Sequence, residues 1–96
     1  MAIARINQFE AKPGQGPGLR RFFERVIGTI RRCPGCCSVQ LLESIEQAER
    51  FAIVEMWDSV EAHQAAAKAI PQEKMQEAMA LLAGPPRGGY FRVLDV

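Results

Sequence analysis

Two residue types that occur once each in the chain lie close together in sequence. The only tryptophan, Trp57, ends an apolar stretch, and the only histidine, His63, follows it six residues later. An imidazole with an ordinary pKa of about 6.5 can act as a general base near neutral pH. A buried indole N–H needs an acceptor. We therefore expect a site here; the alternative interpretations are a His63 that is merely solvent-facing or hydrogen-bonded, and a purely structural Trp57.

Asn7 is a further candidate, in the middle of a segment of alternating polarity that also carries Arg5. A buried asparagine must find hydrogen-bond partners, which can be backbone groups or water. It can instead donate to a substrate carbonyl, or to the enolate or phenolate oxygen that develops during a reaction. Arg5 lies on the same face of this segment and could help to stabilise such an anion.

The three cysteines lie within five residues, Cys33 to Cys37. Cys33 and Cys36 have CxxC spacing, but a zinc site needs about four ligands and the only histidine is far along the chain. A redox pair lowers the pKa of its first thiol at a helix N-terminus, whereas this motif follows a predicted helix. We interpret the cysteines as structural, with a redox-sensitive thiol as the alternative, and predict no metal site.

Composition indicates one soluble globular domain spanning residues 1–96. Hydrophobic residues make up 48% of the chain and charged residues 24%, and the formal net charge is +1. These values give no reason to expect binding to nucleic acid or to an anionic membrane. No apolar run approaches the roughly 20 residues of a spanning helix, and the first residues do not resemble a signal peptide. We therefore expect a cytoplasmic protein.

Alternating polarity predicts four strands, at residues 3–10, 37–44, 51–57 and 90–96. Apolar residues at helical spacing predict a helix over 19–32; they are Leu19, Phe22, Phe23, Val26, Ile27 and Ile30. A second helical region runs from about 60 to 82 and is interrupted at Pro71. Residues 46–50 and 84–89 are predicted loops. Asp58, with Glu61 three residues later, is predicted to cap the second helical region.

The resulting order, β-α-β-β-α-β, predicts an α+β fold of the ferredoxin-like type. In this fold a four-stranded antiparallel sheet carries its helices on one face. The other face of the sheet also has apolar residues, and 96 residues leave nothing to cover it. A homodimer formed through this sheet face is therefore expected.

Three motifs in this order and spacing resemble the antibiotic biosynthesis monooxygenase (ABM) family of the dimeric α+β barrel superfamily. They are residues 12–14 (KPG), 33–39 (CPGCCSV) and 54–62 (VEMWDSVEA). The resemblance spans nearly the whole chain. It implies a homodimer with one pocket per subunit between sheet and helices. It also implies oxidation of planar aromatic compounds by molecular oxygen, often without metal or flavin.

The chain departs from the family pattern at positions that matter for activity. Many members have a histidine nine residues after the tryptophan, where this chain has Ala66. Haem-degrading members have a second tryptophan there and a histidine about ten residues later, where this chain has Gln76. Asn7 matches their third functional residue. The resemblance therefore disfavours haem degradation, and it does not account for His63.

Together these observations predict a cofactor-independent monooxygenase for a small phenol, quinol or polyketide-like aromatic. His63 is the predicted base, and Asn7, with Arg5, the predicted oxyanion stabiliser. The remaining predicted substrate-binding residues are Trp57, Phe23, Ile27, Met79 and Tyr90, with Phe22 and Met75 as further candidates for the apolar walls. One alternative is a non-catalytic dimeric domain that binds a small ligand. Another is a cofactor-free isomerase or lyase.

Overall fold

The predicted order of strands and helices is confirmed, with the second helical region divided in two. The computed structural model describes residues 2–96. Its elements are β1 (Ile3–Glu10), α1 (Gly16–Arg31), β2 (Cys36–Glu43), β3 (Arg50–Trp57), α2 (Val60–Lys68), α3 (Gln72–Leu81) and β4 (Arg87–Arg92).

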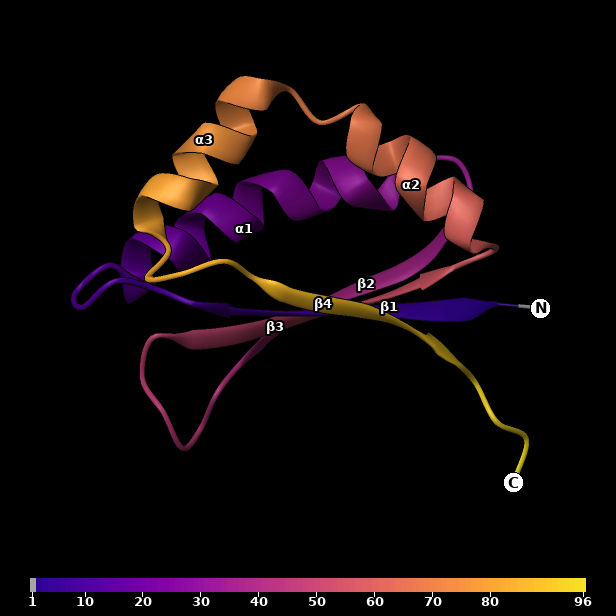
Figure 1. The fold of residues 1–96 in the computed structure, drawn as a ribbon, viewed down its shortest axis with the longest axis horizontal. Helices are drawn as coiled ribbons and strands as arrows, with labels where there is room; N and C mark the ends of the chain where they lie inside the picture. Colours follow the sequence, from indigo (N-terminus) through magenta and orange to yellow (C-terminus); the bar gives the residue numbers. More distant parts are fainter. Residues whose placement is uncertain (1) are drawn as a thin grey trace.

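The four strands form one antiparallel sheet in the order β2-β3-β1-β4, so β1 and β3 are central. All three helices lie on the same face of this sheet, and within residues 2–96 no element lies over the opposite face (Figure 1). This is the ferredoxin-like arrangement. The helix-covered face therefore holds the hydrophobic core and whatever site the sheet and helices enclose.

The core forms where the apolar stripe of α1 meets the covered face of the sheet. Phe23 of α1 packs against Phe9 of β1 and Phe51 of β3, with ring centroids 4.7 and 6.2 Å apart. Leu19 and Trp57 are fully buried. Truncating such a buried aliphatic side chain to alanine costs about 2–5 kcal/mol. This half of the sheet is consequently a rigid platform.

Pro71 separates the two remaining helices, of which α2 contacts β3 and α3 packs against α1 and the core. Pro71 is the N-cap residue of α3, because it cannot continue the hydrogen bonding of α2. The predicted cap of α2 is wrong by one residue: the Ser59 hydroxyl, not the Asp58 carboxylate, accepts from the amide of Ala62. None of the helices in residues 2–96 is long and apolar enough to cross a membrane.

Two strand predictions also need correction. The last strand is Arg87–Arg92, not 90–96, because β1 begins at Ile3, opposite Arg92, and offers no partner further along. In β2 the register shifts between Cys36 and Ser38. Cys36 therefore pairs with Trp57, whereas Cys37 is displaced and exposed. A single-sequence pattern gives no sign of such a bulge.

Candidate functional site

A row of polar side chains crosses three strands on the helix-covered face. The antiparallel register places Arg5 of β1 opposite Glu55 of β3 on one side and opposite Tyr90 of β4 on the other. Trp57 follows Glu55 on the same face of β3, because side chains two residues apart in a strand point the same way. His63 reaches this row from α2, which begins directly after the strand.

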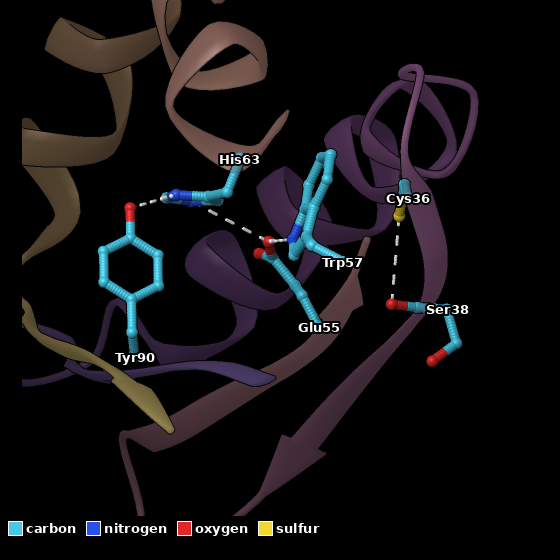
Figure 2. A network of polar contacts seen from close by, with 6 residues as sticks. All are labelled: Cys36, Ser38, Glu55, Trp57, His63 and Tyr90. Atoms are coloured by element: carbon cyan, nitrogen blue, oxygen red, sulfur yellow. Dashed lines mark hydrogen bonds and ion pairs between the residues drawn. The ribbon is translucent and has the colours of Figure 1, made fainter. Parts of the chain in front are cut away.

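His63 lies between the two ends of this row (Figure 2). Its Nδ1 is 2.7 Å from the Tyr90 hydroxyl, and its Nε2 is 4.0 Å from Oε1 of Glu55. The imidazole also meets the rings of Trp57 and Tyr90 edge-on, with centroids 5.5 and 5.3 Å away. Only 15% of the His63 side chain is exposed. His63 is therefore not simply solvent-facing, whereas the alternative of a hydrogen-bonded histidine agrees with its contact to Tyr90.

Glu55 is the buried carboxylate of the site. The Trp57 indole N–H donates to its Oε1 at 2.7 Å, which supplies the acceptor that a buried indole requires. Burial raises the pKa of Glu55 above its ordinary value, and the Trp57 hydrogen bond and the charge of Arg5 oppose this rise in part. A carboxylate in this position costs stability, so a functional role becomes a reasonable expectation.

The pKa of His63 is lowered, first by burial and then by the positive charge of Arg5. The nearby Glu55 does not reverse this, because a separation of 4.0 Å is too long for a hydrogen bond and burial disfavours the imidazolium. His63 is therefore neutral at neutral pH. That is the protonation state from which an imidazole accepts a proton.

Arg5 places a positive charge over the same site. Its guanidinium carbon is 4.7 Å from the centroid of the Tyr90 ring. Its Nε is buried and has no hydrogen-bond partner within residues 2–96. A buried donor without a partner is uncommon and calls for an explanation. A ligand oxygen, neutral or anionic, would satisfy it.

Asn7 lies two residues after Arg5 in β1, on the same face of the sheet and opposite Gly88 of β4. A Cβ on Gly88 would collide with both the Asn7 amide oxygen and the Arg5 guanidinium. Gly88 thus leaves room for these two side chains to lie together over β4. Arg5 is close to Asn7 on one side and to Tyr90 on the other, so it connects Asn7 with the His63 cluster.

The other predicted wall residues lie elsewhere. Phe23 and Ile27 of α1 are buried in the core and present almost no surface to a ligand. Met79 is half-exposed on α3. Ala66, at the position where family members have a histidine, lines a groove between α2 and the turn at Cys33–Gly35. The structure therefore brings together Arg5, Trp57, His63 and Tyr90 among the predicted residues, with Asn7 beside them.

The cysteines form no comparable cluster. All three thiols are free. The pKa of Cys36 is raised, mainly by burial, and that of Cys37 by its hydrogen bond to the Asp58 carboxylate, so both thiols stay protonated at neutral pH. Within residues 2–96, no three His, Cys, Asp or Glu side chains come close enough to hold a metal ion.

Sequence reasoning did not assign a role to Glu55. The signal was present, because Glu55 alternates with Phe51, Ile53 and Trp57 and so shares the face that those apolar residues bury. An ionisable side chain on a buried face is a candidate functional group. The tryptophan two residues later then supplies the donor that holds its carboxylate.

The fold and this cluster define a class: ferredoxin-like α+β proteins with a polar, partly buried site between the sheet and a short helix. The chain belongs to the antibiotic biosynthesis monooxygenase family, whose sequence model matches residues 2–80. Both the expected family and the expected fold are thereby confirmed.

Three similar proteins illustrate the comparison. A mycobilin-producing heme oxygenase from Mycobacterium tuberculosis is 35% identical over 65 residues, which are 68% of this chain and 62% of that relative's length. SnoaB, a cofactor-independent oxygenase from Streptomyces nogalater, superposes with a TM-score of 0.85 at 20% identity over 99% of this chain and 95% of its own. The Mycobacterium tuberculosis protein Rv0793 superposes with a TM-score of 0.86 at 23% identity, covering 100% and 98%. At these identities the two structural matches show a shared fold.

Proposed function

We propose that this protein is a cofactor-independent monooxygenase for a small planar phenol, quinol or polyketide-like aromatic. The observation that carries the proposal is the pairing of a neutral, half-enclosed His63 with the buried, unpartnered Arg5 Nε in one cluster. His63 supplies the base. Arg5 supplies a hydrogen-bond donor for the substrate oxygen that becomes negative when its proton is removed. Removal of a phenolic proton needs both.

Each residue of the cluster has a role in this proposal. His63 receives the proton of the substrate hydroxyl. Arg5 and Asn7 stabilise the resulting oxyanion, since both lie over Gly88 on the same face of the sheet. The rings of Trp57 and Tyr90 flank the imidazole and provide flat apolar surface for an aromatic substrate.

The deprotonated substrate is itself the reductant of dioxygen, which is the co-substrate. An anthrone-like ring carbon loses two hydrogens and gains one oxygen atom from O₂. The second oxygen atom leaves as water with those two hydrogens. The electrons are all supplied by the substrate, so the proposal requires no flavin or metal. The fold shared with SnoaB, a cofactor-independent oxygenase, supports this assignment.

We further propose that the protein is a homodimer joined through the uncovered face of the sheet. That face carries Ile6, Val54, Met56 and Phe91, and the Phe91 side chain is largely exposed. Apolar side chains on a sheet face that no helix covers favour association with a second copy. A two-fold axis would pair the same face of each subunit.

Haem degradation is the second candidate, because a heme oxygenase is 35% identical to this chain. The residues present fit haem poorly. Haem iron is most often held by a histidine, and the Nδ1 of the only histidine is bonded to Tyr90 while its Nε2 faces Glu55. Ala66 and Gln76 replace the side chains expected of haem-degrading members. A non-catalytic domain that binds an apolar ligand is the third candidate.

One set of measurements separates these functions. Oxygen uptake by the purified protein is followed with a panel of hydroquinones and anthrone-like phenols, without added flavin or metal. We expect uptake above the protein-free rate. We expect His63→Ala and Asn7→Ala to lower kcat/KM by about 10²-fold or more, because a base and an oxyanion donor each contribute on that scale.

A glycine pair provides a matched control. Gly88→Ala should lower activity, because its Cβ displaces the Asn7 and Arg5 side chains. Gly89→Ala should not, because its Cβ meets only the Phe91 ring, at an ordinary 3.5 Å. Equal activity in the two variants would contradict the role of Arg5 and Asn7 in stabilising the oxyanion. Tight haem binding, seen as a Soret band, with no uptake on phenols would replace it with the haem candidate. Substrate binding without uptake would favour the ligand-binding domain.

A further inference from the structure

Nδ1 of His63 is engaged in a hydrogen bond, and Nε2 is turned toward a buried carboxylate. Nδ1 is hydrogen-bonded to the Tyr90 hydroxyl at 2.7 Å, and Nε2 faces the Glu55 carboxylate at 4.0 Å (Figure 2). The rings of Trp57 and Tyr90 lie against the imidazole, and the side chain is mostly covered. The one contact of hydrogen-bond length at this base is with Tyr90, so the Tyr90 hydroxyl offers a path for a substrate proton to Nδ1.

The surrounding groups determine which nitrogen carries the hydrogen. Oε1 of Glu55 accepts from the Trp57 indole and is the atom that faces Nε2. A carboxylate oxygen opposite Nε2 favours the tautomer with its hydrogen on that nitrogen. Nδ1 then has a lone pair, and the Tyr90 hydroxyl must donate to it. The Tyr90 hydroxyl thus donates to Nδ1 of His63, and the Nε2–H of His63 points toward Glu55.

Tyr90 is the outermost member of this chain of contacts. It lies on the edge strand β4 and is 37% exposed, whereas Glu55 is buried. The guanidinium of Arg5 lies over its ring, 4.7 Å from the centroid to the Arg5 carbon. This positive charge favours any negative charge that develops on an oxygen beside Tyr90. Tyr90 is therefore the member placed to meet a ligand.

We propose that Tyr90 contacts the substrate hydroxyl and passes its proton to His63, which Glu55 holds in the accepting tautomer. The assignment rests on the oxygenase function proposed above. The O–H bond of the substrate breaks as a new O–H bond forms on the Tyr90 oxygen. The original Tyr90 proton moves to Nδ1 of His63. The products are a substrate anion, a neutral Tyr90 and an imidazolium paired with the Glu55 carboxylate.

This makes Tyr90 a catalytic residue and Glu55 a positioning residue. Carboxylate–histidine–hydroxyl chains in hydrolases use the same division of roles: the carboxylate orients the ring and stabilises its charged form. The 4.0 Å separation suits the second role, because the attraction between Glu55 and His63 becomes strong only once the imidazole is charged.

The sequence allows a test that does not depend on turnover. The chain has one histidine, so ¹⁵N spectra of the labelled protein contain a single pair of ring signals. At neutral pH we expect a protonated Nε2 and a bare Nδ1. In Glu55→Gln, the loss of the carboxylate should shift His63 toward a mixture of tautomers. A protonated Nδ1 in the unmodified protein would overturn the proposal, because Tyr90 would then be the acceptor.

Kinetics then test the contact with substrate. Tyr90→Phe removes only the hydroxyl, and we expect kcat/KM for the same hydroquinones to fall by about 10²-fold or more. If His63 takes the proton directly, the variant frees Nδ1 and its rate stays equal or rises, which would overturn the relay. Failure of the unmodified protein to consume oxygen would overturn the oxygenase function alone, because the tautomer measurement still decides whether Tyr90 donates to His63.

Discussion

Glu55 holds the Trp57 indole and faces His63, but its ionised form is disfavoured by burial. Its carboxyl group is buried on the same face as Phe51, Ile53 and Trp57. The one hydrogen bond it receives in residues 2–96 comes from the Trp57 indole. Burial raises its pKa above the ordinary value of 4.5. The ionised form is therefore less favourable in the folded protein than in the unfolded chain.

The sign of the linkage follows from this direction. Because the folded-state pKa of Glu55 is higher, its contribution to stability is fully present below the unfolded pKa. It is lost as the pH rises through the folded pKa. We predict that Glu55→Gln raises the free energy of unfolding near neutral pH, since the amide keeps an oxygen for Trp57 without a buried charge. The difference should shrink as the pH falls toward 4.5. Urea unfolding across this range measures it.

Glu46→Gln is the control for this prediction, because Glu46 is an exposed carboxylate in the β2–β3 loop. It should leave the free energy of unfolding within about 0.5 kcal/mol of the unmodified value at each pH. A Glu55→Gln variant that is less stable than the unmodified protein at neutral pH would contradict the prediction. It would mean that Arg5 and Trp57 together outweigh the burial of the charge.

At the scale of elements, the start of α2 determines where His63 lies. The Ser59 hydroxyl accepts from the Ala62 amide at 3.1 Å, and this caps the helix one residue before Val60. Gly35 lies beneath this first turn with φ +87°, and a Cβ there would be 2.7 Å from the Cβ of Ala62. The cap and the glycine together allow α2 to approach the sheet closely enough for His63 to reach Tyr90.

We predict that Ser59→Ala lowers the free energy of unfolding by about 1 kcal/mol, the typical cost of losing a serine cap. Asp58→Ala should cost less, because the exposed Asp58 carboxylate accepts only a weak hydrogen bond from the Cys37 thiol. Chemical denaturation of the two variants makes the comparison. A larger loss of free energy of unfolding in Asp58→Ala than in Ser59→Ala would show that Asp58, not Ser59, caps the helix.

Sequence patterns predicted the elements well where periodicity is strong. The alternation in residues 3–10 and the stripe from Leu19 to Ile30 gave β1 and α1 nearly in full. The start of β4 was missed because Gly88 and Gly89 are poor strand residues in isolation. Gly88 pairs with Asn7 in the sheet, and it is a glycine because a side chain at this position would displace those of Asn7 and Arg5. This requirement for glycine becomes visible only once the register between β1 and β4 is known.

The site was likewise predictable only in part, because its assembly depends on how the strands pair. Trp57, His63, Arg5 and Tyr90 could be chosen by type, but their meeting depends on the register that sets Arg5 between Glu55 and Tyr90. Phe23 and Ile27 fit the expected stripe of α1, yet nothing in that stripe tells a core residue from a pocket wall. Tertiary packing decides this, and it places both in the core.

At the scale of the whole molecule, the sheet has two unlike faces. One carries the three helices, and the other is uncovered in Figure 1. Tyr90 and Phe91 are neighbours in β4 but belong to opposite faces, since side chains alternate along a strand. The same strand therefore serves the site with one side chain and the proposed dimer interface with the next.

We predict that Phe91→Asp converts the proposed dimer to a monomer, because it places a charge among the apolar side chains of the proposed interface. Met75→Asp is the matched control. Met75 and Phe91 are each 53% exposed, but Met75 lies on α3, on the helix side. Light scattering coupled to size exclusion measures both masses. A monomeric unmodified protein, or a Phe91→Asp variant that remains dimeric, would contradict the prediction.

The short helices over the site have one more consequence. Neither α2 nor α3 contains a fully buried side chain, whereas α1 contains five buried residues. α2 and α3 bury less of their own surface than α1 does, so separating them from the sheet should cost less free energy than separating α1. Amide hydrogens in α2 and α3 should accordingly exchange with solvent sooner than those in the central strands. Local opening of these short helices would give a substrate access to the His63 cluster.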